Sequence, residues 1–275
     1  MRTWLITGCS TGFGRALALE VIAAGENVVA TARDASTVQD LADQHPEQVE
    51  VVALDVTRPE QNAAAVDRAL ERFGQVDVLV NNAGYGYRAA VEEGADSDVR
   101  ELFETNFFGA VDLTRRVLPS MRARRAGTIV NISSISARLT PAGSAYYSAS
   151  KAALEALTLG LRAEAAPLGI RAIAVEPGAF RTDFAGRSLV GSEESLDDYE
   201  ATVGPRRKAN DHTHGTQLGD PVKAVRAIIA AVNSDDPPAL LMLGADAVDF
   251  FRAKNAELVR DVDDWEAVSR DTAVS

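Results

Sequence analysis

The chain has 275 residues, 46% of them hydrophobic, a single cysteine (Cys9) and a formal net charge of −12. This length and apolar content predict one α/β body with a sizeable core, and the lone cysteine excludes an internal disulfide and a cysteine-rich metal site. The negative charge excludes nucleic acid and anionic membrane surfaces as expected partners, so we expect a small-molecule substrate.

Short apolar segments alternate with segments of helical periodicity along most of the chain. Seven candidate strands are Thr3–Thr7, Asn27–Ala32, Val49–Leu54, Val76–Asn81, Thr128–Ser133, Ile170–Glu176 and Ala239–Leu243. Repeated strand–helix units with mostly apolar strands predict a Rossmann-like, doubly wound parallel sheet with helices on both faces. We expect this single domain to span residues 1–245, with ligands bound beyond the carboxyl ends of the strands.

The two end regions of the chain carry their own expectations. The first strand begins at Thr3 and leaves no room for a signal peptide, and no apolar run reaches the ~18 residues of a membrane span. We therefore expect a soluble, cytoplasmic protein with no membrane partner. Residues 246–275 carry apolar residues at helical spacing, from Val248 to Trp265. They predict a C-terminal helix docked on the body, with a subunit contact or a cover over the substrate pocket as the alternative.

Residues 183–220 form a polar, glycine-rich and charged stretch that is too long for an ordinary connection. Long loops in compact domains are often lids, so this stretch predicts a substrate lid. We expect the substrate pocket to lie between the lid, the Tyr85–Ala90 segment and the Leu139–Ser144 segment. Phe184, Leu189, Val190 and Tyr199 would give the lid apolar contacts.

Residues 7–14 read TGCSTGFG and allow two interpretations. Gly8, Gly12 and Gly14 follow a strand and open a helix, where glycines let backbone N–H groups approach a phosphate. The segment Gly8–Gly12 also fits the G-x-S-x-G nucleophile elbow, with Ser10 as the nucleophile of a hydrolase. The position next to the first strand favours the phosphate-binding loop.

A hydrolase would also need a histidine downstream of its nucleophile. The candidates are His45, His212 and His214, all in polar, loop-like segments and without the cysteine or histidine neighbours of a metal site. We therefore interpret Ser10 as a loop residue beside a phosphate and Cys9 as a small buried residue. We expect no bound metal.

Tyr147 and Lys151 are four residues apart on a predicted helix, so their side chains share one face. A cation at that distance favours phenolate over phenol, which predicts a lowered tyrosine pKa and a group that can donate and accept a proton. The neighbouring Tyr146 has no lysine at the same spacing. Without further motifs, such a pair also fits a solvated helix face.

Several motifs in a fixed order resemble the short-chain dehydrogenase/reductase family, in its single-domain form with a Tyr-x-x-x-Lys signature. The resemblance runs from Thr3 to about Leu243. It rests on Thr7-Gly8-x-x-x-Gly12-x-Gly14, Asp55-Val56, NNAG at residues 81–84, Asn106, Ser134 thirteen residues before Tyr147, Tyr147-Ser148-Ala149-Ser150-Lys151, and Pro177-Gly178 followed by Thr182.

The resemblance implies hydride transfer between a nicotinamide and a carbonyl or alcohol carbon. It implies that the catalytic residues are Asn106, Ser134, Tyr147 and Lys151. The residues that bind the cofactor would be Gly8, Ser10, Thr11, Gly12, Phe13, Gly14, Arg33, Asp55, Val56, Asn82, Ala83, Gly84, Tyr147, Lys151, Pro177, Gly178 and Thr182.

Each catalytic residue has an implied role in this family. Tyr147 would be the general acid/base, and Lys151 would bind the nicotinamide ribose and lower the tyrosine pKa. Ser134 would orient the substrate oxygen, and the spacing favours it over Ser133. Asn106 would anchor a water, the alternative being a side chain that caps or kinks its own helix.

The end of the second strand bears on the choice of cofactor. A carboxylate there would bind the adenosine ribose and repel a 2′-phosphate, but the sequence has Ala32 followed by Arg33. Because an arginine can pair with a phosphate, we expect NADP(H), with NAD(H) as the alternative. Thr11 and Asp34 weigh against this preference, and Arg33 could also be an ordinary exposed arginine.

Two functions remain open. The first is an NAD(P)-dependent oxidoreductase of the class EC 1.1.1.-, acting as a carbonyl reductase or alcohol dehydrogenase on a small or medium apolar substrate. The second is a catalytically idle NADP(H)-binding sensor or scaffold module. The intact catalytic set favours the enzyme, and the family resemblance also implies a homo-oligomer, a dimer or a tetramer.

Overall fold

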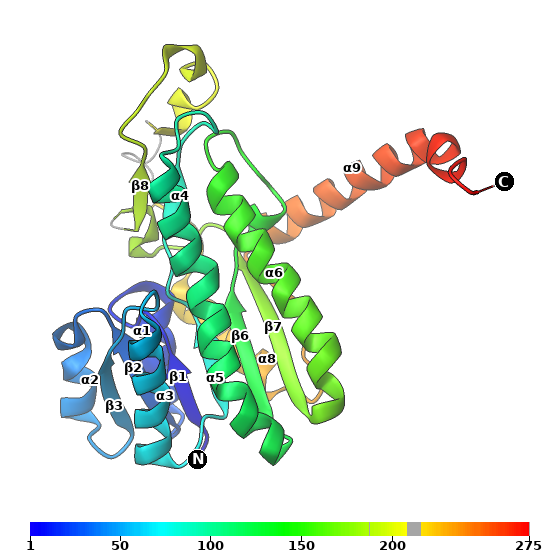
Figure 1. The fold of residues 1–275 in the computed structure, drawn as a ribbon. Coiled ribbons are helices and arrows are strands. Elements are labelled where there is room, and N and C mark those ends of the chain that lie inside the picture. Colours follow the sequence, from blue (N-terminus) through cyan, green and yellow to red (C-terminus); the bar gives the residue numbers. More distant parts are fainter. Residues whose placement is uncertain (187, 208–215, 275) are drawn as a thin grey trace.

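One parallel sheet forms the centre of the protein (Figure 1). The computed structural model describes residues 1–186, 188–207 and 216–274. The sheet has seven strands in the order β3-β2-β1-β4-β6-β7-β9. They are β1 (Thr3–Ile6), β2 (Asn27–Ala32), β3 (Val49–Ala53), β4 (Val78–Asn81), β6 (Gly127–Ile132), β7 (Ile170–Pro177) and β9 (Leu240–Leu243). The predicted fold class and the seven predicted strands are confirmed.

Helices cover both faces of the sheet, as predicted. The α-helices of the described residues are α1 (Gly12–Ala23), α2 (Gln39–Gln44), α3 (Pro59–Phe73), α4 (Asp96–Phe103), α5 (Gly109–Arg124), α6 (Ala145–Ala165), α8 (Pro221–Asn233) and α9 (Ala245–Arg270), of which α9 does not cover the sheet. Trp4 and Ile6 of β1 pack with α1, α2 and α8 on one face. Leu5, pointing the other way, packs with α3, α5 and α6, because successive side chains of a strand alternate between faces.

Local signals set where these helices begin and end. Helix α3 has Pro59 in its first turn, where no N–H partner is lost, and ends at Gly74 with φ 81°. Helix α8 begins after Asp220, whose carboxylate accepts hydrogen bonds from the backbone N–H groups of Val222 and Lys223. The turns between strands and helices are therefore determined mainly by nearby residues.

The direction in which the chain adds strands changes between β1 and β4. Strands β2 and β3 lie on one side of β1, while β4, β6, β7 and β9 lie on the other. Such a switch opens a crevice beyond the carboxyl ends of the two central strands. The glycine loop follows β1 and Asn82 follows β4, so both reach this crevice.

A second, two-stranded parallel sheet lies above the crevice, and the sequence did not predict it. It pairs β5 (Gly86–Arg88) with β8 (Leu189–Gly191), Gly86 opposite Leu189 and Arg88 opposite Gly191. The 183–220 segment is thereby attached to the chain that follows β4 (Figure 1). His212 and His214 lie outside the described residues.

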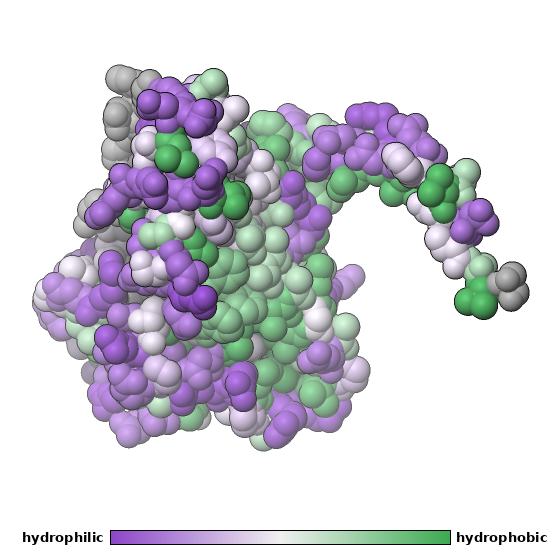
Figure 2. All heavy atoms as spheres, turned by 45° about the horizontal axis from the view of Figure 1, so that its top comes forward, coloured by the Kyte–Doolittle hydropathy of each residue, from purple (hydrophilic) through white to green (hydrophobic). Residues whose placement is uncertain are grey.

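Helix α9 projects away from the body as an arm (Figures 1 and 2). The predicted C-terminal helix exists, but the expectation that it docks on the body is wrong beyond its first turns. Ala247 is fully buried, whereas Val262 and Trp265 are 66% and 64% exposed. The apolar spacing identified a helix correctly, but one whose stripe has no cover within the described chain. None of the described helices is both long and apolar enough to cross a membrane.

Candidate active site

A cavity of about 900 Å³ lies beyond the carboxyl ends of the central strands. Its wall includes most of the site residues expected from the sequence, namely Gly8, Ser10, Thr11, Gly12, Phe13, Arg33, Asp55, Val56, Asn82, Ala83, Gly84, Ser134, Tyr147, Lys151, Pro177, Gly178 and Thr182. Gly14 and Asn106 are not part of the wall. Segments far apart in the sequence therefore meet around one space.

The glycines of the first loop are required by backbone geometry and by close packing. Gly8 and Gly12 have φ values of +72° and +59°, which side chains disfavour. A Cβ on Gly14 would lie 2.2 Å from the Gly8 carbonyl oxygen and 2.6 Å from Asn82 Nδ2. Helix α1 can therefore begin directly under the loop, as a phosphate site requires.

Thr7 and Asn82 hold the glycine loop against the end of β4. Asn82 Nδ2 donates to the carbonyl oxygens of Thr7 and Gly8 at 2.8 and 3.1 Å. The Thr7 hydroxyl accepts from the N–H groups of Asn82 and Ala83, both at 2.9 Å. The NNAG segment thus supports the loop from below, in keeping with its expected place at the cavity floor.

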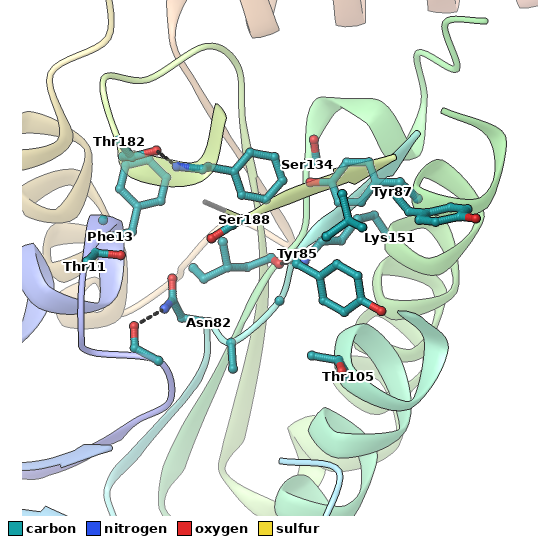
Figure 3. Close-up of a pocket in the computed structure, with 18 of the residues that line it drawn as sticks. Thr11, Phe13, Asn82, Tyr85, Tyr87, Thr105, Ser134, Lys151, Thr182 and Ser188 are labelled. Atoms are coloured by element: carbon teal, nitrogen blue, oxygen red, sulfur yellow. Dashed lines mark hydrogen bonds between the residues drawn. The ribbon is translucent and has the colours of Figure 1, made fainter. Parts of the chain in front are cut away.

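Tyr147 and Ser134 both line the cavity, and Figure 3 shows Ser134 in this wall from close by. Burial raises the pKa of Tyr147 to about 12, and a hydrogen bond with the Ser134 hydroxyl lowers it by less. The sequence predicted a lowered tyrosine pKa, and that prediction is wrong. Desolvation outweighs the hydrogen bond with Ser134.

Lys151 is 4% exposed, and its ammonium nitrogen donates to the Ile132 carbonyl oxygen at 2.8 Å. The nitrogen lies 5.9 Å from the centre of the Tyr147 ring. Burial lowers the pKa of Lys151 to about 8. Spacing along α6 therefore brings the pair together as expected, but the ammonium is not in direct contact with the phenol oxygen.

Ser133 and Ser134 have different partners. The Ser133 hydroxyl is buried and donates to the Lys151 carbonyl oxygen at 3.0 Å. Ser134 Oγ accepts from the Ser136 N–H at 3.1 Å and lies in the wall beside Tyr147. This arrangement agrees with Ser134 as the serine that faces the substrate.

Asn106 lies in a π-helical turn (Glu104–Phe108) between α4 and α5. Its Oδ1 accepts from the Tyr85 N–H at 3.0 Å, and its Nδ2 donates to the Tyr85 carbonyl oxygen at 2.9 Å and to Ser150 Oγ at 3.1 Å. It therefore does not cap its own helix. The insertion turns the amide toward the cavity floor, and π-helical turns of this kind are frequent at functional sites.

Arg33 is exposed and lies in the cavity wall at the end of β2. Its neighbour Asp34 is turned toward its own chain, because Asp34 Oδ1 accepts from Ser36 N at 3.0 Å and from Ser36 Oγ at 2.7 Å. The serine bonds hold the pKa of Asp34 below its usual value. The acidic neighbour is thus engaged in a turn.

Two aromatic contacts near the lid were only partly foreseen. The Phe184 ring lies 5.8 Å from the Tyr147 ring, so the 183–220 segment contributes an apolar contact at Tyr147. Phe180, which the sequence analysis missed, packs edge-on against Phe13 at 5.2 Å. Its position in the sequence, between Gly178 and Thr182 of the expected cofactor site, could have pointed to it.

The segments expected to build the substrate pocket contribute unequally. Tyr85, Tyr87 and Arg88 line the cavity, but the Leu139–Ser144 segment contributes no residue to the described wall.

A charged cluster connects α6 and β7. Arg138, which follows Ser134 in the chain, pairs with Glu155 of α6 and with Glu176 of β7. Burial and the neighbouring Glu155 raise the pKa of Glu176 to about 8. Because Arg138 also stacks over Phe251 at 5.1 Å, the cluster reaches the root of α9.

Comparison with known proteins places the chain in a family. The short chain dehydrogenase model matches residues 2–190. Oxidoreductase BOA17 of Botryotinia fuckeliana is 35% identical over 270 residues, covering 98% of each chain. A crystal structure of a short-chain dehydrogenase from Streptomyces avermitilis has 45% identity and a TM-score of 0.93, covering 99% of this chain and 98% of that one.

Two more distant solved structures contain cofactors. ElxO with NADP bound has 27% identity and a TM-score of 0.73, covering 90% of this chain and 99% of its own. A 3-ketoacyl-(acyl-carrier-protein) reductase from Brucella melitensis, complexed with NADH, has 26% identity and a TM-score of 0.73, covering 88% and 96%. Fold, motifs and family match agree, and the chain belongs to the short-chain dehydrogenase/reductase family of oxidoreductases.

Proposed function

We propose that the protein transfers hydride between NADP(H) and the carbonyl or alcohol carbon of a small or medium substrate, in the class EC 1.1.1.-. The observation that carries the proposal is one continuous cavity with the glycine loop at one end and Ser134, Tyr147 and Lys151 at the other. Such a cavity joins a phosphate-binding loop to a proton donor. Reduction of a carbonyl by a dinucleotide requires both.

The residues present fit a nicotinamide dinucleotide. The loop offers backbone N–H groups at the start of α1, with no side chain at Gly8 or Gly12 to keep a pyrophosphate away. Among the described residues, the Lys151 ammonium has one hydrogen-bond acceptor, the Ile132 carbonyl. Its remaining N–H groups would hold the ribose hydroxyls.

The chain's own groups would handle the proton. A bound nicotinamide supplies or accepts the hydride. Tyr147, protonated at neutral pH because its pKa is raised, would donate to the substrate oxygen during reduction and accept the proton during oxidation. Ser134 would orient the same oxygen, a contribution of about 2–4 kcal/mol to the barrier. Lys151 would stabilise the phenolate, and Asn106 would anchor the water that leads from Lys151 to solvent.

Two features support NADP(H) as the preferred cofactor. Arg33 lies in the wall where a 2′-phosphate would sit, and Asp34 is held in its own turn. NAD(H) is the alternative, since solved relatives contain either cofactor.

The test is a panel of aldehydes, ketosteroids, quinones and β-keto esters with NADPH and NADH. We expect Tyr147→Phe to lose turnover by at least about a hundredfold while NADPH binding persists. Tyr146→Phe is the matched control, because the Tyr146 hydroxyl donates to the Val91 carbonyl, outside the cavity wall. NADPH binding without turnover by the wild type would favour the idle sensor or scaffold module.

We also propose a homo-oligomer. Apolar side chains on α9 remain open to solvent, including Leu258 at 48%, Val262 at 66% and Trp265 at 64% exposure. They recur at intervals of four and three residues, the spacing of an apolar helix stripe. A second copy of the chain would cover such a stripe. The exposed arm supports assembly without fixing the number of subunits.

A further inference from the structure

Two arginine side chains near the substrate end of the cavity have no acidic partner. Arg88, at the end of β5, is in the cavity wall, and Arg206 lies next to it in the lid. Both are partly buried. In the part of the chain that the structure describes, no carboxylate oxygen lies within 4.0 Å of either guanidinium. The adjacent Arg207, in contrast, is paired.

The Arg88 guanidinium contacts the backbone of Arg206. Arg88 Nη1 donates to the carbonyl oxygen of Arg206, and the Arg206 Nε is buried with no hydrogen-bond partner. Burial, together with the positive charge of Arg206, lowers the pKa of Arg88 to about 10. Burial also lowers the pKa of Arg206. Two cations held together without an anion are unfavourable unless a ligand supplies one.

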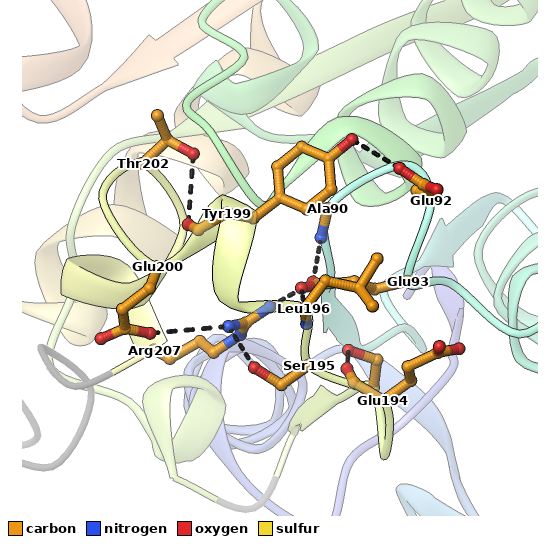
Figure 4. A network of polar contacts seen from close by, with 11 residues as sticks. Ala90, Glu92, Glu93, Glu194, Ser195, Leu196, Tyr199, Glu200, Thr202 and Arg207 are labelled. Atoms are coloured by element: carbon orange, nitrogen blue, oxygen red, sulfur yellow. Dashed lines mark hydrogen bonds and ion pairs between the residues drawn. The ribbon is translucent and has the colours of Figure 1, made fainter.

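A buried glutamate fixes the lid in this position (Figure 4). The Glu93 side chain accepts from the Ala90 N–H at 2.7 Å and the Leu196 N–H at 2.9 Å, and it forms an ion pair with Arg207. Its charge is therefore balanced locally. These contacts of Glu93 hold the lid so that Arg206 lies beside Arg88. Because the Glu93 carboxylate pairs with Arg207, it does not neutralise Arg88 or Arg206.

The other acidic residues in the cavity wall do not fill this role. Asp98 accepts a hydrogen bond from the Tyr87 hydroxyl at 3.0 Å. Glu101 and Glu193 are exposed, and neither forms an ion pair with Arg88 or Arg206 within 4.0 Å. None of these carboxylates therefore pairs with Arg88 or Arg206.

An apolar path connects the proton donor to the arginines. Phe184 lies against Tyr147 at 5.8 Å, and a Cβ on Gly86 would lie 3.2 Å from the Phe184 ring. Arg88 is two residues farther along the same strand and on the same face, about 7 Å beyond Gly86. A molecule with its carbonyl at Tyr147 would therefore cross apolar surface before reaching Arg88.

We infer that Arg88 and Arg206 form an anion-binding subsite, and that the substrate is an amphipathic oxo acid or the corresponding hydroxy acid. Its carbonyl or alcohol would lie at Tyr147, its apolar chain against Phe184, and its carboxylate at Arg88. Guanidinium groups recognise carboxylates through paired N–H donors. The inference rests on the proposed function and specifies its substrate class.

The test compares oxo acids with their uncharged methyl esters. 6-Oxohexanoate, 8-oxooctanoate and 10-oxodecanoate, each beside its methyl ester, are assayed with NADPH. We expect kcat/KM to favour at least one acid over its ester by tenfold or more. Arg88→Gln and Arg206→Gln should each reduce the acid value at least tenfold and leave the ester value unchanged. Arg100→Gln is the control, because Arg100 is an exposed α4 residue that pairs with Asp96.

The outcomes distinguish a failure of the anion-binding subsite from a failure of the proposed oxidoreductase function. If wild type reduces acids and esters equally and Tyr147→Phe abolishes both, the subsite is wrong and the oxidoreductase stands. If none of the compounds is reduced, the binding of decanoate and of 1-decanol, measured by calorimetry, tests the anion-binding subsite independently of the reaction. Tighter binding of decanoate that Arg88→Gln removes supports it, and equal binding overturns it.

Unfolding in urea provides a second readout. Each arginine lacks a counter-ion, so its replacement by glutamine should leave the unfolding midpoint unchanged or raise it. A lower midpoint in both variants would show that the arginines hold the lid in place, and would count against a ligand-binding role. Two separate variants keep the test valid if one of them does not fold.

Discussion

The Lys151 ammonium nitrogen lies 5.9 Å from the centre of the Tyr147 ring, and burial moves the two pKa values apart. The pKa of the lysine falls to about 8 and that of the tyrosine rises to about 12. At neutral pH Lys151 carries a charge that burial disfavours, whereas Tyr147 is in the neutral form that burial favours. The protein therefore maintains the Lys151 charge at a cost to stability, which is typical of residues kept for function.

The cost should be measurable as a pH dependence of stability. Below pH 8 Lys151 is charged in both the folded and the unfolded chain, and only the folded chain bears the cost of burying that charge. Between about 8 and the ordinary value of 10.5 the unfolded chain alone holds the proton, so stability rises with pH. We expect Lys151→Met to be more stable than wild type by up to about 3 kcal/mol at pH 7, with the difference disappearing near pH 10.5.

Urea unfolding of both proteins at pH 7, 8.5 and 10 measures this difference. The variant also loses the bond to the Ile132 carbonyl, which offsets the gain by about 1 kcal/mol. A variant less stable than wild type at pH 7 by more than that amount would contradict the prediction. Its turnover should be lost in every case.

Gly84 and Gly160 offer a matched pair of glycine-to-alanine changes. A Cβ on Gly84 would lie 2.9 Å from Asn106 Oδ1 and 3.3 Å from Lys151 Nζ, whereas a Cβ on Gly160 would meet nothing within 4 Å. We expect Gly84→Ala to reduce kcat by tenfold or more, because the side chains of Asn106 and Lys151, which we propose to be catalytic, must move. Gly160→Ala, within α6, should keep full activity and gain about 0.5–1 kcal/mol. Kinetics and thermal melts of both variants check this, and equal kcat values would refute it.

Arg33 should determine the cofactor preference. A hydrogen bond to a charged group is worth about 1.5–3 kcal/mol, so Arg33→Gln should lower kcat/KM for NADPH about ten- to hundredfold and leave that for NADH unchanged. Asp34→Asn serves as the control, since the Asp34 carboxylate is engaged with Ser36. A wild-type preference for NADH, or an equal loss of kcat/KM with both cofactors in Arg33→Gln, would contradict the proposed role of Arg33.

The arm formed by α9 should carry a subunit contact. Val262 and Val91 are 66% and 64% exposed, the first on α9 and the second on the body. We expect Val262→Asp to reduce the molar mass measured by light scattering, because a charge would enter an apolar contact. Val91→Asp should leave the mass unchanged. A monomeric wild type, or identical masses for all three proteins, would show that the arm does not mediate assembly.

Much of this site could be predicted from the sequence because its determinants are local. Gly8, Gly12 and Gly14 are close in the chain, and their roles follow from one strand–loop–helix unit. Tyr147 and Lys151 share one turn of one helix. The cavity then brings these segments together because parallel strands end on the same edge of a sheet.

Other features could not be predicted because they depend on distant residues. Strand β5 has only Gly86, Tyr87 and Arg88, too short to show a period, and it forms by pairing with β8 more than a hundred residues later. The pKa of Tyr147 depends on how completely the surrounding elements exclude water. The stripe on α9 reveals an apolar face, but its spacing contains no information on what covers that face.

The root of α9 contacts two segments of the active site. The Asp246 carboxylate accepts from the Ala179 N–H at 2.7 Å, in the loop that begins at Pro177-Gly178. The Phe251 ring lies under the guanidinium group of Arg138, a residue of the segment that follows Ser134. A displacement of α9 would therefore be transmitted to both the loop that begins at Pro177-Gly178 and the segment that follows Ser134. If a second subunit holds the arm, specific activity should rise with protein concentration, and an activity constant over a wide dilution range would show that the arm transmits nothing.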